Sequence, residues 1–322
     1  MYITTLMKRV LVTGAAGFLG SHLVDHHISK GDEVHGVDNF SSSSPNSKHH
    51  RNLCSNEKYS FESLDISSQQ FAQIYAGKQF DIIYNFACPA SPPKYQEIPL
   101  ETMMTCVAGT NNVLSLATKK TIVVHASTSE VYGDPSVSPQ PETYKGCVNS
   151  YGPRACYDEG KRAAEALCYD YRNKYGIDAR LVRIFNTYGP RMDPDDGRVI
   201  TNFVKQALLG KSLTVYGAGK QTRSFCYVTD LVCGITKMAE LNRNPGTPIN
   251  LGNPSEFTVL DLAQKVIDRL GGNIEYKSLP VDDPMQRRPD ITVAQKMLDW
   301  SPKISIDIGL DKMIEYMRNI HV

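Results

Sequence analysis

Residues 8–20 read KRVLVTGAAGFLG, and this stretch decides the fold that the sequence predicts. Its first half is a short apolar run typical of a buried strand, and its second half is a glycine-rich turn that opens a helix. Glycines at such a turn let backbone N–H groups and the positive end of the helix dipole approach a pyrophosphate. The residues expected to line this cradle are Gly14, Gly17, Phe18 and Leu19. The stretch therefore predicts a dinucleotide-binding strand, turn and helix.

A second strand-like run, residues 33–38, ends in Asp38 at about the 20-residue spacing expected after such glycines. The carboxylate of Asp38 can accept hydrogen bonds from both hydroxyls of an adenosine ribose, and it would repel a 2′-phosphate. Asn39 follows it directly and is included in the predicted cofactor site. NAD is therefore expected rather than NADP.

Strand-like and helical runs alternate after this point. The further strands are predicted at residues 59–64, 81–87, 121–126 and 179–185, with a long helix at about 98–119. This rhythm predicts an α/β fold, a Rossmann-like doubly wound parallel sheet, whose ligands lie beyond the carboxyl ends of the strands. Asp65, Ile66 and Ala87 stand at such ends and are expected beside the cofactor. We predict an NAD-binding domain over 7–190 and, mainly over 191–322, a smaller α/β substrate lobe with some segments returning to the sheet.

Tyr157 and Lys161 lie four residues apart in a helical run that follows Pro153, so they share one helix face. An ammonium one turn away is expected to stabilise the phenolate, which would make Tyr157 a base for a sugar hydroxyl near neutral pH. Thr128, Ser129 and Glu130 follow the fifth strand and are expected at the same edge of the sheet. These five residues form the predicted catalytic group.

Composition narrows the class of protein. Lys and Arg number 35 against 34 Asp and Glu, which argues against a nucleic-acid or membrane-surface protein. The eight cysteines are scattered without CxxC pairs, and no Cys/His spacing predicts a metal site. Reduced thiols and the lack of an apolar run near the ~18 residues of a membrane span predict a cytoplasmic protein.

Taken together, the glycine loop, Asp38, the Ser127/Thr128 pair and the Tyr157/Lys161 pair resemble the extended short-chain dehydrogenases/reductases that act on nucleotide sugars, the NAD-dependent epimerase/dehydratase family. Within this family the sequence is most similar to the UDP-glucuronate decarboxylases. The runs that carry this similarity are residues 87–92, 127–135, 152–162, 183–192 and 221–228. Departures from the family pattern are Ser41 to Ser47, Cys106 in place of an asparagine, and Ser150-Tyr151 in place of Pro-Ile.

The resemblance implies tightly bound NAD and a redox-neutral decarboxylation of UDP-glucuronate to UDP-xylose through a 4-keto intermediate. Tyr157 would take the proton from the carbon 4 hydroxyl, with Thr128 or Ser127 holding the same oxygen. Glu130 would serve carbon 5, and Ser129 would hydrogen-bond the carboxylate.

Other functions on the same fold stay open at this point. A sugar 4,6-dehydratase needs two acids at the strand end, where this sequence has Ser129 and Glu130. A 4-epimerase has no need of Glu130. An oxidative decarboxylase would release the 4-keto pentose, and a cofactor-bound scaffold without turnover is disfavoured by the complete catalytic group.

The smaller lobe carries arginines whose charge suits a diphosphate: Arg191, Arg198, Arg223, Arg287 and Arg288. Arg223, Asn186 and Arg288 are expected to hold a diphosphate, while Val199, Phe203 and Tyr216 flank a uracil. Pro89, Ser129 and Arg191 complete the predicted substrate site. The resemblance also implies a homodimer through the helix over 98–119 and the Tyr157 helix, with a face supplied by Met103, Met104, Val107, Ala163, Leu167 and Tyr171.

Overall fold

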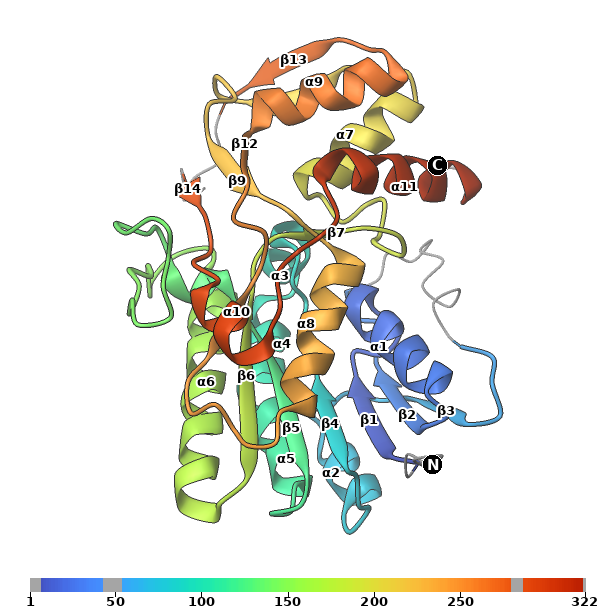
Figure 1. The fold of residues 1–322 in the computed structure, drawn as a ribbon, viewed down its shortest axis with the longest axis vertical. Coiled ribbons are helices and arrows are strands. Elements are labelled where there is room, and N and C mark those ends of the chain that lie inside the picture. Colours follow the sequence, from blue (N-terminus) through green and yellow to red (C-terminus); the bar gives the residue numbers. More distant parts are fainter. Residues whose placement is uncertain (1–6, 43–53, 279–285, 321–322) are drawn as a thin grey trace.

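The computed structural model describes residues 7–42, 54–278 and 286–320, and its centre is a seven-stranded parallel sheet (Figure 1). The strand order is β11-β6-β5-β4-β1-β2-β3. The bounds are β1 Arg9–Thr13, β2 Glu33–Asp38, β3 Tyr59–Ser63, β4 Ile82–Asn85, β5 Ile122–Thr128, β6 Asp178–Ile184 and β11 Ile249–Leu251. From β1 the chain adds β2 and β3 on one side of the sheet, and then β4, β5 and β6 on the other side. The strand order therefore reverses between β1 and β4, and a ligand crevice is expected there at the carboxyl edge.

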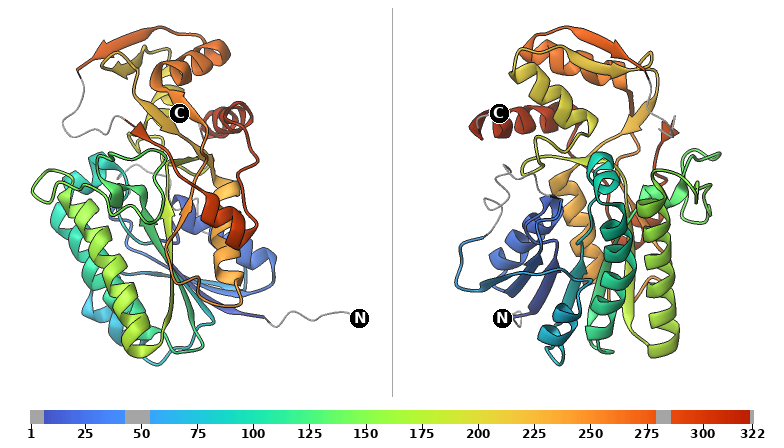
Figure 2. Two further views of the ribbon diagram at one scale, coloured as in Figure 1. Left: turned by 60° about the vertical axis from the view of Figure 1, so that its left-hand side comes forward. Right: turned by 180° about the vertical axis from the view of Figure 1, so that it is seen from behind.

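Helices cover both faces of the sheet (Figures 1 and 2). One face carries α1 (Phe18–Ser29), α8 (Val228–Glu240) and α10 (Thr292–Leu298). The other carries α2 (Gln69–Tyr75), α4 (Pro99–Met104), the π-helical turn η2 (Thr105–Gly109), α5 (Thr110–Leu116) and α6 (Ala155–Tyr175). Strand side chains alternate between the faces: Val10 and Val12 join the core under α1, and Leu11 joins the core under α5. The apolar run of β1 is continuous because the strand contributes side chains to a core on both faces of the sheet.

The helix predicted over 98–119 is interrupted rather than regular. It consists of α4, η2 and α5, and it is preceded by the short helix α3 (Pro92–Glu97). Gly109 ends the π-helical turn where the chain passes Ile66, and a Cβ built there would lie 2.7 Å from the Ile66 Cδ1 atom. The close approach of this helix to the end of β3 thus requires glycine.

A smaller lobe stands beyond the carboxyl ends of the strands, at the top of Figure 1. It contains α7 (Val199–Leu208), β8 (Leu213–Tyr216), β9 (Thr222–Ser224), β12 (Glu256–Thr258), α9 (Val259–Leu270), β13 (Ile274–Lys277), β14 (Gln286–Arg287) and α11 (Ile306–Asn319). Short pairings link the lobe: β13 with β8, and β12-β9-β14. Between lobe and sheet, β7 (Thr187–Tyr188) pairs with β10 (Cys226–Tyr227).

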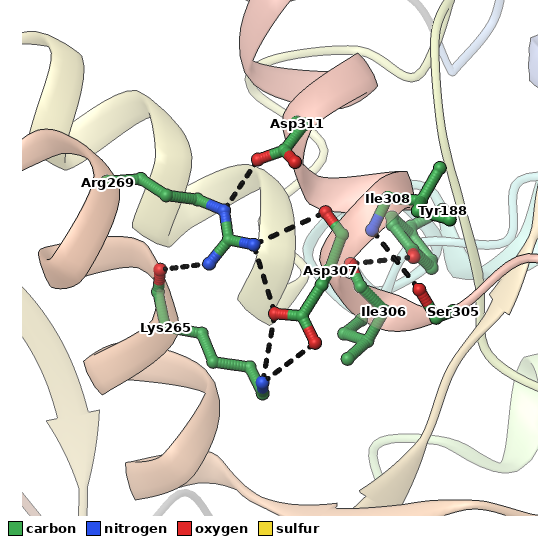
Figure 3. A network of polar contacts seen from close by, with 8 residues as sticks. All are labelled: Tyr188, Lys265, Arg269, Ser305, Ile306, Asp307, Ile308 and Asp311. Carbon is green, nitrogen blue, oxygen red and sulfur yellow. Dashed lines mark hydrogen bonds and ion pairs between the residues drawn. The ribbon is translucent and has the colours of Figure 1, made fainter.

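Charged side chains join α9 to α11 on the outside of this lobe (Figure 3). Arg269 donates to Asp311 at 2.6 Å and to Asp307 at 3.0 Å, and Lys265 reaches Asp307 at 3.0 Å. Both aspartates are largely exposed, so each pair is expected to contribute only about 0–1 kcal/mol. The lobe is therefore stabilised mainly by its apolar core, with this network fixing how the two helices align.

Within the described ranges, no helix combines the length and apolar character that crossing a membrane requires.

Candidate active site

A cavity of about 890 Å³ runs along the carboxyl edge of the sheet and continues under the smaller lobe. One end is lined by the glycine loop, and the middle by the end of β5 and the start of α6. The far end is lined by α7, β8 and the β9 strand. This volume lies at the upper end of the range of small-molecule sites, and its elongated lining suits two ligands placed end to end.

The glycine loop packs too closely for side chains. Gly14 has a φ of +73°, and a Cβ there would lie 2.8 Å from the Phe86 backbone. At Gly20 a Cβ would lie 2.0 Å from the Gly14 carbonyl oxygen. Gly17 is the N-cap of α1 and has no side chain to cap it, so the first-turn N–H groups face the cavity edge. This part of the structure fits a dinucleotide pyrophosphate.

Asp38 lies at the end of β2, beside this loop. Its carboxylate accepts hydrogen bonds from the backbone N–H of Ala16 at 3.1 Å and of Phe40 at 2.8 Å. These bonds fix the carboxylate while it lines the cavity. The other predicted cofactor residues, Gly14, Gly17, Phe18, Leu19, Asn39, Asp65, Ile66 and Ala87, line the cavity as well.

Tyr157 and Lys161 lie on α6 with both side chains buried against the end of β5. Thr128, at the end of β5, lines the cavity beside Tyr157. Lys161 donates its Nζ to the Ala126 carbonyl at 2.8 Å, and this Nζ stands 5.8 Å from the centre of the Tyr157 ring. The structure thus brings the predicted tyrosine, lysine and threonine together at the cavity wall.

The pKa of Tyr157 moves in the direction opposite to the sequence-based expectation. Burial raises the pKa well above that of a free phenol, and the charge of Cys88 adds to this, while the Thr128 hydrogen bond acts against it. The charges of Cys106 and Glu130 raise it further. These surroundings favour the protonated phenol of Tyr157.

Tyr95, which the sequence did not single out, stacks on Tyr157. The ring centres are 4.9 Å apart and the planes differ by 3°. Tyr95 lies on α3 and lines the cavity. The stack packs one aromatic ring against the other and so orients the ring of Tyr157.

Glu130 stands between two arginines. Its Oε2 accepts from Arg154 Nη2 at 2.7 Å, and its Oε1 lies 3.1 Å from Arg287 Nη1. Arg287 also donates to Ser129 Oγ at 3.2 Å and to the Gly133 carbonyl at 2.9 Å. Burial alone would raise the pKa of Glu130, but the charges of Arg287 and Arg154 lower it overall. Glu130 is therefore a carboxylate, not a proton donor, in this structure.

Ser127 and Thr128 face opposite sides of β5, which separates their roles. Ser127 donates its hydroxyl to Glu165 at 2.5 Å, and Glu165 is paired with Arg183. Thr128 lies on the side of Tyr157. Because the Ser127 hydroxyl is already bound to Glu165, Thr128 is the better placed of the two candidates for holding a substrate oxygen.

Most predicted substrate residues line the cavity, but two do not. Pro89, Ser129, Asn186, Val199, Phe203, Tyr216 and Arg223 are in its wall. Arg191 turns to α1, where it donates to the Ser21 carbonyl at 3.1 Å and pairs with Asp25. Arg288 donates to the Pro254 carbonyl at 3.1 Å and lies 3.6 Å from Glu256. Both guanidinium groups are directed by local oxygen acceptors, which their charge alone did not reveal.

Arg287 is the residue of the site that sequence reasoning placed least well. Its charge made it one of five arginines suited to a diphosphate, yet only its neighbour Arg288 was placed in the predicted substrate site. Arg287 lines the cavity and is 3% exposed. The pairing of β14 with β9 directs it inward. Alternation along a strand was the available signal, because adjacent residues of a strand face opposite sides. Among the described residues, no group of three or more His, Cys, Asp and Glu side chains is placed to hold a metal ion.

Of the departures from the family pattern, residues 43–47 lie outside the described residues. Tyr151 is 98% exposed and does not line the cavity. Cys106 is buried in η2, next to Cys88.

Comparison with known proteins gives one consistent set of relatives. The model of the NAD dependent epimerase/dehydratase family matches residues 10–252. UDP-glucuronic acid decarboxylase 1 of Arabidopsis thaliana is 49% identical over 315 residues, covering 97% of this chain and 70% of that protein. The protein of the same name from Xenopus tropicalis is 46% identical over 314 residues, covering 97% and 72%. The structure of UDP-glucuronic acid 4-epimerase from Bacillus cereus, in complex with UDP-glucuronic acid and NAD, superposes with a TM-score of 0.86 at 29% identity, covering 97% of this chain and 100% of that one.

Proposed function

Because the chain belongs to the NAD dependent epimerase/dehydratase family, we propose that it decarboxylates UDP-glucuronate to UDP-xylose through a 4-keto sugar. The observation that carries the proposal is the end of β5, where the cavity presents Ser129 and an ionised Glu130 beside Tyr157. Relatives that are 46–49% identical over nearly the whole chain are named for this reaction.

The glycine loop, Asp38 and Lys161 would hold NAD, and the tight approaches at Gly14 and Gly20 fit its pyrophosphate. When bound, NAD supplies a hydride acceptor and donor for carbon 4 of the sugar, and its positively charged ring favours an ionised Tyr157. Asp38, oriented by hydrogen bonds from the Ala16 and Phe40 N–H groups, lines the cavity wall and would accept from the ribose hydroxyls.

Tyr157 takes the proton of the carbon 4 hydroxyl, and Thr128 hydrogen-bonds the same oxygen. The resulting 4-keto sugar is a β-keto acid, so carbon dioxide leaves and its electron pair passes onto the carbon 4 oxygen. The protonated Tyr157 then stabilises that enolate. Decarboxylation therefore asks for no further base to break the carbon–carbon bond.

Glu130 cannot donate a proton itself while Arg287 and Arg154 lower its pKa. We assign to it the positioning of a water that returns a proton to carbon 5. Arg287, fixed between Ser129 and Glu130, places a positive charge where the sugar carboxylate would lie. A 4,6-dehydratase would instead need an acid at position 129, and a serine is a poor proton donor to a leaving hydroxide.

At the far end of the cavity, Arg223 and Asn186 are proposed to hold the diphosphate, and Val199, Phe203 and Tyr216 to flank the uracil. Arg191 and Arg288 are excluded from this set by their contacts outside the cavity wall. Of the three arginines predicted to bind the substrate, Arg191, Arg223 and Arg288, only Arg223 is therefore proposed to contact the nucleotide.

The deciding experiment incubates the purified protein with UDP-glucuronate and follows carbon dioxide together with the mass of the nucleotide product. UDP-xylose with one carbon dioxide per turnover is expected. UDP-galacturonate without carbon dioxide would make the protein a 4-epimerase. A 4-keto pentose with reduced NAD would make it an oxidative decarboxylase, and a 4-keto-6-deoxy sugar from UDP-glucose would make it a dehydratase.

We further propose a homodimer formed by the outer face of α4, η2, α5 and α6, which lie side by side on one face of the sheet (Figure 2, right). Met104 and Leu100 expose 52% and 77% of their surface there, and Leu167 and Tyr171 line a shallow pocket nearby. Such apolar exposure on α4, beside a pocket on α6, fits a subunit contact. A sedimentation mass of two chains at micromolar concentration is expected.

The eight cysteines, all within the described ranges, carry free thiols. A reducing compartment keeps thiols in this state, so we propose a cytoplasmic location. Fractionation of cells that express the full-length protein tests this.

A further inference from the structure

Two thiols face each other at the edge of the cavity. Cys88 lies in the loop after β4 and lines the cavity, whereas Cys106 lies in the π-helical turn η2 and is 2% exposed. Their Sγ atoms are 3.3 Å apart, although the residues are 18 positions apart in sequence. Closing to the S–S bond length of about 2.04 Å would need an approach of only roughly 1.3 Å.

We propose that Cys88 and Cys106 form a peroxide-sensitive dithiol that closes reversibly to a disulfide and slows the enzyme. The site would take hydrogen peroxide or a small organic hydroperoxide, which can reach Cys88 through the cavity. Nothing in the proposed decarboxylation uses either thiol, so this is a property of the chain beyond its catalytic chemistry.

The surroundings divide the two thiols between the two steps of such an oxidation. The hydrogen bond from Cys106, together with the charge of Lys161, lowers the pKa of Cys88 to about 7, although burial acts in the other direction. The pKa of Cys106 is raised by its bond to Cys88 and by burial. Cys88 is therefore the thiolate that attacks, and Cys106 the thiol that resolves.

The electron count closes with peroxide as the only oxidant. The Cys88 thiolate attacks one peroxide oxygen, an S–O bond forms, the O–O bond breaks and the departing hydroxide is protonated to water. Cys106 then attacks the Cys88 sulfur, the S–S bond forms and the S–O bond breaks, releasing the second water. Two thiols lose two electrons, and one peroxide becomes two waters.

Closure should displace the Cys88 loop rather than the helix. Cys106 is held against α6, where a Cβ at Gly160 would lie 3.0 Å from the Cys106 Cβ. The mobile partner is then the loop that also carries Ala87 and Pro89, both in the cavity wall. A shift of this loop by about 1 Å beside the reacting groups is expected to lower turnover by roughly 10- to 100-fold.

The chain makes the test direct, because trypsin places the two thiols in separate single-cysteine peptides, residues 79–94 and 95–119. The full-length protein is treated with hydrogen peroxide, remaining thiols are blocked with N-ethylmaleimide, and the digest is analysed by mass spectrometry with and without dithiothreitol. Decarboxylase activity is measured on the same samples. Cys106→Ser is the test variant, and Cys233→Ser, which removes an exposed thiol elsewhere, is the matched control.

We expect a linked 79–94/95–119 peptide in the wild type and in Cys233→Ser, with activity lost and then restored by dithiothreitol. Cys106→Ser should form no linked peptide, and its peroxide inhibition should not follow the reversible wild-type pattern. Absence of the linked peptide, or reversible inhibition of Cys106→Ser equal to the wild type, overturns the inference. The activity result rests on the proposed function, whereas the peptide result does not: a reduced protein without turnover would refute the function and leave the dithiol to be judged by the peptide alone.

Discussion

The two sides of the cavity are built by different physical means. On the cofactor side the shape of the cavity is set mainly by the backbone. Gly14 has a positive φ, and Asp38 is oriented by two backbone N–H groups. On the substrate side three charged side chains, Glu130, Arg154 and Arg287, hold each other. A backbone site is sensitive to added volume, whereas an ion cluster is sensitive to the loss of one charge, which leaves its partners uncompensated. Tyr157 lies where the two sides meet.

Removing the Tyr157 hydroxyl should have the largest effect on turnover, because the proposed proton transfer takes place at this hydroxyl, where the two sides of the cavity meet. Tyr157→Phe is expected to lower turnover by about 10³–10⁴-fold, at the upper end for a lost acid/base group. Reduction of bound NAD after mixing with UDP-glucuronate, followed by absorbance, measures the first step. Tyr95→Phe is the matched control, since it keeps the ring that stacks on Tyr157 and should retain turnover within a few-fold. A Tyr157→Phe protein that still reduces NAD would assign the proton transfer to another group.

Neutralising Glu130 should break the substrate side while leaving the cofactor side intact. Glu130→Gln is expected to lower turnover by roughly 10²–10³-fold, as for an acid/base variant, with NAD affinity unchanged. Glu165→Gln is the control, because it also breaks a 2.7 Å pair with an arginine, Arg183, beside the same strand. Glu165→Gln should lower the melting temperature and leave turnover nearly unchanged. Equal losses of turnover in both variants would mean that Glu130 acts only through its structural ion pairs.

The same contrast explains what could be predicted from the sequence. The family and the sheet were predicted correctly, and the residues predicted to bind the cofactor line the cavity, because contiguous glycines and an acid at a strand end report backbone geometry directly. Side chains whose partners come from distant segments were harder. Arg287 enters the site through the pairing of β14 with β9, more than 60 positions along the chain, and no local pattern encodes that pairing.

Electrostatic expectations failed for a related reason. The spacing of Tyr157 and Lys161 was correct, yet the inferred shift of the Tyr157 pKa had the wrong direction, because burial and the charge of Cys88 raise it. Arg191 and Arg288 were assigned by charge, and neighbouring acceptors turn both away from the cavity wall. Spacing predicts which residues are near one another, and only the assembled structure tells how each is solvated.

An effect of intermediate size is expected from two arginines of the smaller lobe, which differ in whether they line the cavity. Arg223 lines the cavity, and Arg288 lies outside its wall. Arg223→Ala should weaken UDP binding by about 10- to 100-fold, since a charge-assisted hydrogen bond contributes ~1.5–3 kcal/mol. Arg288→Ala should leave UDP affinity within a few-fold, and NAD affinity should be unchanged in both. Calorimetric titration with UDP measures this, and equal weakening in the two variants would return Arg288 to the diphosphate site.

The smallest expected effect concerns Asp158, which lies beneath the ion cluster. Burial raises the pKa of this carboxyl to about 7, the charge of Glu130 adds to the rise, and Arg154 and Arg287 oppose it. The folded protein therefore holds a proton on Asp158 at pH values where the unfolded chain has released it. Stability linked to this group falls as pH rises from about 4, the ordinary range of an aspartate, to about 7, and is constant above that.

Asp158→Asn keeps the shape of the side chain and removes its titration. The difference in unfolding free energy between the variant and the wild type should thus grow in favour of the variant from pH 4 to 7 and then level off. Denaturant unfolding of both proteins at several pH values measures the difference, so other titrating groups cancel. Asp170→Asn, an exposed change on the same helix, should show no such trend. If the difference instead shrinks as pH rises, Asp158 is ionised throughout this range and acts as a third charged member of the Glu130 cluster, which would make the substrate side an array of two arginines and two carboxylates.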